Sequence, residues 1–176
     1  MTWFRLSSRP PAPWYAAGLA FECSACGRCC AGPNEGYVWL GDREIAAIAE
    51  FLSTSAEEVR RQYVRRVDGH FSLIERPDNH DCIFLLPAGA TAAQPPWATG
   101  QNVSTGAAHP WHPVARGCRI YAVRPLQCRN WPFWAGNLSS PESWSQAAQR
   151  CPGVNRGRRF SAEEIHERSR PPQSDD

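Results

Sequence analysis

Eight cysteines in a chain of 176 residues constrain this sequence more than any other feature. Four of them fall in one short run, and the rest are spread over the remaining chain. In order they are Cys23, Cys26, Cys29, Cys30, Cys82, Cys118, Cys128 and Cys151. Clustered cysteines serve as disulfide bridges or as metal ligands. Neighbouring Cys29 and Cys30 could be bridged only with strained geometry. The run is also too tight for several stapled loops, so it predicts a metal or cluster site.

The N-terminal sequence bears on the same choice, because disulfide frameworks belong to secreted chains. A secretory signal needs an apolar stretch of about 7–15 residues. Here a single Arg precedes a Ser-Arg-Pro-Pro-Ala-Pro break, and no such stretch follows. We therefore expect a cytoplasmic protein with reduced thiols. No run approaches the ~20 apolar residues of a membrane span, and a net charge of +2 is too balanced to indicate a nucleic-acid partner. A protein partner stays open.

Composition and periodicity predict one small, loop-rich α+β domain, stabilised by its metal, with few short strands and two or three helices. Apolar spacing and capping residues favour helices over 42–52, from Ser55 to about Val67, and over 161–168. Short strands are expected at 37–40, 71–75, 82–86 and 118–121. One helical turn is expected within 124–129, with Pro125 at its first position.

The chain divides into a core domain and three flanking or inserted segments. Residues 1–20 are expected to form an extended lead-in that docks Trp14 and Tyr15, residues 21–168 the domain, and residues 169–176 a disordered tail. Residues 87–116 interrupt the domain, and 16 of these 30 residues are Ala, Pro or Gly. We interpret them as an inserted surface loop that splits a hairpin. Its His109 and His112 are expected to be exposed rather than ligands.

The spacing Cys23-x-x-Cys26-x-x-Cys29 places three thiols on one tight loop around a single centre. Bacterial ferredoxins use a similar run, with a distant Cys-Pro pair, to bind a [4Fe–4S] cluster, and Cys151-Pro152 could take that remote position. Zinc modules more often use two separated pairs. The spacing favours an iron–sulfur cluster and leaves zinc open.

The remaining thiols, Cys30, Cys82, Cys118 and Cys128, can converge from different elements, so one or two four-cysteine sites are open. Nearby cations stabilise thiolates. Arg28, Arg119, Arg124 and Arg129 each lie within four residues of a cysteine. We expect them to offset the charge of the centre.

Catalytic signatures give no support for a particular enzyme. All 19 basic residues are Arg, which excludes a Schiff-base lysine and a phosphate-loop lysine. The sequence has neither an H-E-x-x-H nor a G-x-S-x-G motif. The sequence leaves open whether the protein is an enzyme.

The cysteine pattern resembles the bacterial CxxCxxCC cysteine-cluster proteins, the YkgJ-type zinc- or iron-chelating domain. The matching segments are 21–30, 82–85, 118–121, 124–133 and 151–153, which include all eight cysteines. The resemblance implies that these thiols bind zinc or iron. Related domains occur in flagellin lysine N-methylases. Three functions follow: an iron–sulfur protein with a redox or enzyme-auxiliary role, a zinc-stabilised scaffold or interaction module, and a protein N-methylase-like enzyme. Segment 87–116 departs from the family pattern.

Overall fold

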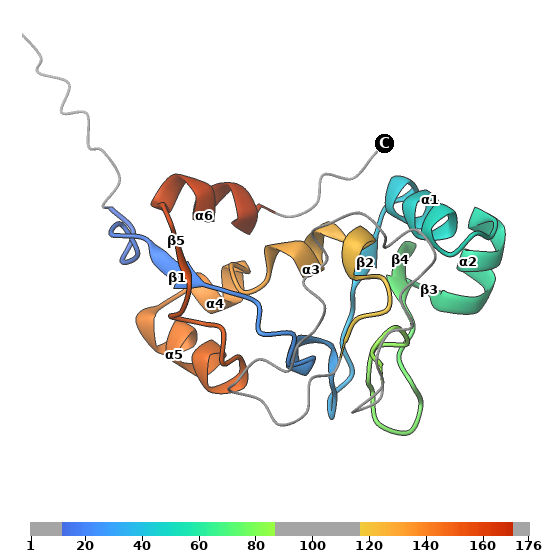
Figure 1. Ribbon diagram of the computed structural model, residues 1–176, viewed down its shortest axis with the longest axis horizontal. Helices are drawn as coiled ribbons and strands as arrows, with labels where there is room; N and C mark the ends of the chain where they lie inside the picture. The colour runs from blue at the N-terminus through green and yellow to red at the C-terminus, as the bar shows by residue number, and fades with distance from the viewer. Residues whose placement is uncertain (1–11, 87–116, 171–176) are drawn as a thin grey trace, which may run out of the picture.

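The computed structural model describes residues 12–86 and 117–170. Within these ranges it shows a small domain of short helices and short antiparallel strands, which confirms the predicted α+β class (Figure 1). Most of the lead-in, the insertion with His109 and His112, and most of the tail lie outside the described residues. Trp14 and Tyr15 do dock as expected: Trp14 Nε1 donates to the Leu138 carbonyl at 2.8 Å, and Tyr15 packs against buried residues.

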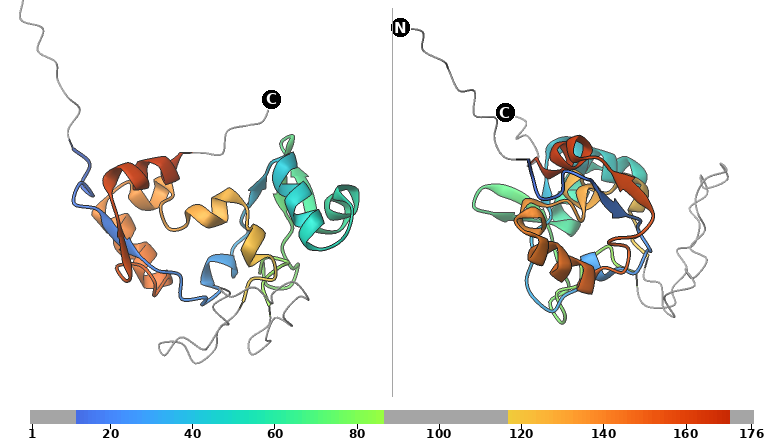
Figure 2. Two further views of the ribbon diagram at one scale, coloured as in Figure 1. Left: turned by 45° about the horizontal axis from the view of Figure 1, so that its top comes forward. Right: turned by 90° about the vertical axis from the view of Figure 1, so that its left-hand side faces the viewer.

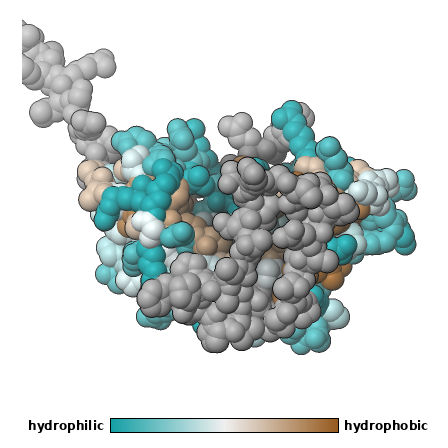
Figure 3. Space-filling view, in the orientation of Figure 1, coloured by the Kyte–Doolittle hydropathy of each residue, from teal (hydrophilic) through white to brown (hydrophobic). Residues whose placement is uncertain are grey.

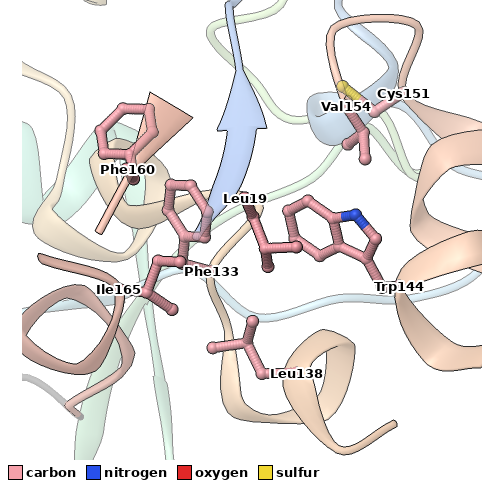
Figure 4. Packing of buried hydrophobic residues seen from close by; sticks show 8 residues of the cluster. All are labelled: Leu19, Phe133, Leu138, Trp144, Cys151, Val154, Phe160 and Ile165. Carbon is pink, nitrogen blue, oxygen red and sulfur yellow. The ribbon is translucent and has the colours of Figure 1, made fainter. Parts of the chain in front are cut away.

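One end of the molecule is built from both ends of the described chain. Strand β1 (Leu19–Phe21) pairs antiparallel with β5 (Arg158–Phe160), and Leu19 stands opposite Phe160. Helices α4 (Ala135–Leu138), α5 (Pro141–Arg150) and α6 (Ala162–Ser169) lie around this ribbon (Figure 1). They enclose a set of buried residues that we call the terminal core (Figure 4), namely Leu19, Phe133, Leu138, Trp144, Cys151, Val154, Phe160 and Ile165.

The other end is a three-stranded sheet with two helices. The strand order is β2 (Trp39–Leu40), β4 (His70–Leu73) and β3 (Val64–Val67), all antiparallel. Helices α1 (Asp42–Phe51) and α2 (Ala56–Tyr63) contact each other and cover this sheet. Their buried side chains form what we call the sheet core, namely Leu40, Ile45, Ile48, Ala49, Val59, Leu73, Phe84 and Ile120.

Helix α3 (Leu126–Asn130) and the segment that follows β1 lie between these two ends in Figure 1 and in the left view of Figure 2. The face shown in Figure 3 is mainly hydrophilic over α6 and over the α1–α2 end. The described chain contains no helix long and apolar enough to cross a membrane.

The described residues thus form two small apolar cores, the terminal core and the sheet core, with the connecting segments between them.

Several predicted elements differ from the structure. The helix that starts after Ser55 ends at Tyr63 rather than near Val67, because Val64–Val67 pairs with His70–Leu73 as a hairpin. Its two-residue turn, Asp68-Gly69, has positive φ at both positions (49° and 85°), as a primed turn requires. The expected strands at 82–86 and 118–121 are reduced to isolated bridges, Glu75 to Cys82 and Leu85 to Cys118.

The prediction of two or three helices was too low for the described residues. Helix α5 was missed although Ser140 accepts a hydrogen bond from the Ser143 N–H and Pro141 occupies the first helical position. Short α4 was missed as well. Helices α1 and α6 were predicted within one residue at each end. The two sides of the insertion do pair, since Leu86 N–H donates to the Gly117 carbonyl at 2.8 Å.

Candidate metal centre

All eight cysteines belong to the described residues, and none of them forms a disulfide. They lie at the junction of the two cores. Cys151 is a member of the terminal core, where its sulfur stands at the edge beside Val154 (Figure 4). Cys82 and Cys118 pack against the sheet core, while Cys128 lies on α3 between the two. The remaining four thiols are on the segment that connects β1 to β2. The fold therefore brings cysteines from four parts of the sequence to one region.

The cysteine run is anchored to the terminal side of the junction through Gly153. The Glu22 N–H donates to the Gly153 carbonyl at 3.1 Å, and Phe21 forms a β-bridge with Val154. A Cβ atom on Gly153 would stand only 1.9 Å from the Glu22 carbonyl oxygen, so the backbones meet where a side chain cannot fit. This contact fixes the run beside the turn that carries Cys151.

The other end of the run is anchored to the sheet side. The Cys82 N–H donates to the Cys30 carbonyl at 2.7 Å, and the Gly32 N–H donates to Asp81 Oδ1 at 3.2 Å. A Cβ atom on Gly32 would stand 1.9 Å from the Asn79 carbonyl oxygen. The run is thus held at both ends by backbone contacts, which bring its thiols between Cys82 and Cys151.

Cys29 has the most thiol neighbours in this region. Its Sγ lies 3.6 Å from Cys30 Sγ, a contact that lowers the pKa of Cys29 and raises that of Cys30. A thiolate at Cys29 is also close enough to raise the pKa values of Cys82, Cys118 and Cys128. Five sulfurs, two from the run and one each at Cys82, Cys118 and Cys128, therefore share one electrostatic environment.

Burial is the first cause that shifts the pKa values of three of the four thiols outside the run, Cys82, Cys118 and Cys128. It raises the pKa of Cys118 to about 12 and also raises the pKa values of Cys82 and Cys128. Their mutual charges add to the effect, since a thiolate at Cys82 raises the pKa values of both other thiols. Several thiolates can exist together here only if a positive charge joins them.

Cys26 extends the set toward the terminal core. Its contact with Cys151 is the first cause that raises the pKa of Cys151, ahead of burial. A Cys26 thiolate also raises the pKa of Cys29. Cys26 therefore connects Cys151 to the five thiols around Cys29, and seven of the eight predicted ligands form one continuous set. Cys23 is exposed, and its described contact is with Tyr121.

Of the four arginines predicted to offset the thiolates, Arg124 is the one with a described role. Its charge lowers the pKa values of Cys29, Cys118 and Cys128, although other causes are larger. The guanidinium stacks on Tyr121, 3.6 Å from the ring centroid, and its Nε donates to the Tyr121 carbonyl at 3.0 Å. Arg76, which the sequence did not single out, acts in the same direction on Cys82.

Soft thiolate donors are the ligand chemistry of zinc and of iron–sulfur clusters. The donor set therefore fits these centres. Yet in residues 12–86 and 117–170, no group of three or more His, Cys, Asp or Glu side chains is arranged to hold a metal ion. The sulfurs are neighbours, but they do not surround a single point.

Comparison with known proteins identifies no function. The chain is 28% identical over 119 residues to an uncharacterized protein of Methanocaldococcus jannaschii, an alignment that covers 68% of this chain and 48% of the archaeal protein. The chain thus spans about half the length of that relative. No family model matches the sequence. No solved structure matches it either.

Proposed function

We propose that this chain is a metal-binding cysteine-cluster protein that holds an iron–sulfur cluster through Cys thiolates and has a redox or enzyme-auxiliary role. The observation that carries the proposal is the gathering of thiols from four parts of the sequence between two cores. Unbridged cysteines packed together would repel one another as thiolates. A cationic inorganic centre would remove that repulsion and would account for the gathering of the thiols. The likeness to CxxCxxCC proteins supports the same chemistry.

The spacing Cys23-x-x-Cys26-x-x-Cys29, together with the distant Cys151-Pro152, favours a cluster over a single ion. Around one zinc ion all four sulfurs lie about 2.3 Å from the same point. In a [4Fe–4S] cluster each iron takes one thiolate, so the ligands stand farther apart. We place Cys29, Cys82, Cys118 and Cys128 foremost among the ligands, with Cys26, Cys30, Cys151 and Cys23 completing the candidate set. When bound, such a centre would supply one-electron chemistry.

A zinc-stabilised scaffold or interaction module is the second candidate, and one observation favours it. The thiols lie between the terminal core and the sheet core, where a structural ion would join two small apolar clusters. Metal binding would then contribute directly to folding. The protein lysine N-methylase alternative stays a prediction of the resemblance, to be tested by methyl transfer to a protein lysine.

Anaerobic purification, an absorption spectrum and elemental analysis separate the two candidates. We expect a brown protein that contains iron and acid-labile sulfide. A colourless protein with stoichiometric zinc would reject the iron–sulfur proposal in favour of the scaffold. A protein that binds neither metal under anaerobic conditions, even after reconstitution with ferrous iron and sulfide or with zinc, would reject both.

Deletion of residues 90–112 is expected to leave the metal content nearly unchanged. All eight cysteines lie outside that segment, and its flanks meet through the pairing of Leu85 with Cys118. Metal per chain before and after the deletion, measured by elemental analysis, checks this expectation. A deletion variant that purifies folded but without metal would show that His109 or His112 supplies a ligand.

A further inference from the structure

The indole of Trp131 contributes a buried donor to the edge of the thiol set. Its Nε1 is shielded from solvent and makes no hydrogen bond of normal geometry in the described structure. Trp131 packs against the terminal core, to which Cys151 belongs, and its N–H opposes the causes that raise the pKa of the Cys151 thiol. A buried N–H without a partner destabilises the folded protein. We therefore expect a hydrogen-bond acceptor for the Trp131 N–H in the functional form of the protein.

The surroundings hold the Trp131 ring in place. Trp131 directly follows α3, the helix that carries Cys128, and Phe133 N–H donates back to the Asn130 carbonyl at 2.8 Å. The ring meets that of Trp134 edge to face, with centroids 4.9 Å apart. Trp134 is itself fixed, since its Nε1 donates to the Gln127 carbonyl at 2.8 Å. The backbone of Trp131 therefore leads from one candidate ligand while its side chain faces another.

A neutral thiol is a weak hydrogen-bond acceptor, whereas a thiolate accepts a charge-assisted bond. Cys151 becomes a thiolate when it ligates a metal. The N–H of Trp131 would then have a full hydrogen-bond acceptor in the Cys151 sulfur. Donors to ligating atoms orient the ligand and tune the centre.

We infer that Trp131 is a positioning residue of the metal centre, whose indole N–H donates to the sulfur of metal-bound Cys151. This inference rests on the proposed function, because it requires Cys151 to be a ligand. It adds a donor that belongs to the rigid aromatic segment 131–134 rather than to the cysteine run. In an iron–sulfur centre, such a donor stabilises the more negative, reduced state and raises the reduction potential.

The test uses Trp131→Phe, which removes the N–H and keeps an aromatic ring. Trp144→Phe is the matched control: Trp144 lies in the terminal core, but its Nε1 donates to Asn155 Oδ1 at 2.8 Å. Wild type and both variants are purified anaerobically and challenged with EDTA, and the iron and zinc that remain bound are followed over time. We expect Trp131→Phe to weaken metal retention about 10- to 100-fold, and Trp144→Phe to retain metal as wild type does.

If the centre contains iron, its midpoint potential gives a second measurement. A general loss of protein stability would not shift this potential in a predictable direction. We expect a more negative potential in Trp131→Phe than in Trp144→Phe. Equal retention and equal potential in the two variants would overturn the inference while leaving the metal centre intact. A wild-type protein that binds no metal would instead reject the proposed function.

A measurement on wild type covers the case in which Trp131→Phe does not fold. The tryptophan indole N–H signals of the metal-free and zinc-loaded protein are compared by NMR hydrogen exchange. We expect exchange of the Trp131 proton to slow on loading, because it gains an acceptor, while the Trp144 proton changes little. An unchanged exchange rate at Trp131 in zinc-loaded protein would overturn the inference.

Discussion

Replacement of Cys29 by serine is expected to abolish most of the metal binding and to lower solubility with it. Cys29 contacts Cys30 and lies within electrostatic range of Cys26, Cys82, Cys118 and Cys128. A serine hydroxyl does not replace a thiolate as a soft ligand. Because the centre lies between two small cores, its loss should also lower the free energy of unfolding. Elemental analysis of anaerobically purified protein measures the first effect, and thermal unfolding with and without EDTA measures the second.

The control for this variant is Ala31→Ser, which introduces a serine into the same segment and removes no thiol. We expect it to keep wild-type metal content. Cys26→Ser provides a further comparison, since Cys26 lies between Cys29 and Cys151 and its loss should also lower metal content. If Cys29→Ser retained full metal occupancy and unfolded with the same EDTA dependence as wild type, Cys29 would not be a ligand.

The sequence was informative wherever a local pattern determines the structure. Helix α6 followed from its capping box, in which Ser161 and Glu164 exchange hydrogen bonds with each other's backbone N–H groups. Helix α1 followed from the apolar positions that Ile45 and Ile48 occupy in the sheet core. These signals lie within a few residues of one another, so no tertiary information was needed.

The errors arose where pairing partners are distant or very short. Strands β1 and β5 are three residues each and pair across almost the whole chain, so no local period reveals them. The hairpin of β3 and β4 is a different case, because Asp68-Gly69 is a strong turn signal that the helical pattern of the preceding residues obscured. Tertiary pairing here overrode an apparent helix.

The sequence identified the candidate ligands, but it did not show which of them contact one another. Spacing predicted that Cys29 and Cys30 project in different directions, and this was wrong, because their sulfurs stand only 3.6 Å apart. It could not show that Cys151 contacts Cys26, or that Arg124 rather than Arg28 acts on the central thiols, because both depend on how the two ends of the domain meet. Trp131 could have been suspected, since it belongs to an aromatic segment that closely follows Cys128. Only the structure shows which group the Trp131 N–H faces.

The second large effect is expected from Gly153→Ala, a change that removes no ligand. The new methyl group would overlap the Glu22 carbonyl oxygen, which stands 1.9 Å from the ideal Cβ position. This oxygen belongs to the backbone and cannot rotate away as a side-chain atom could. The β1 segment and the Cys151 turn must therefore separate, which breaks the 3.1 Å hydrogen bond from Glu22 N–H to the Gly153 carbonyl. Overpacking of this kind typically costs about 1–3 kcal/mol. Urea unfolding under anaerobic conditions measures the loss.

The matched control is Gly136→Ala, since Gly136 lies in α4 and a Cβ there would meet no atom within 4 Å. Alanine should be neutral or should stabilise that helix by about 0.5–1 kcal/mol. The two glycine variants also separate anchoring from ligation. Because Gly153 fixes the cysteine run beside Cys151, its variant should lose metal to EDTA faster than wild type while every thiol is still present. If Gly153→Ala matched Gly136→Ala in both unfolding and metal retention, the contact between the run and the Cys151 turn would not be what positions the thiols.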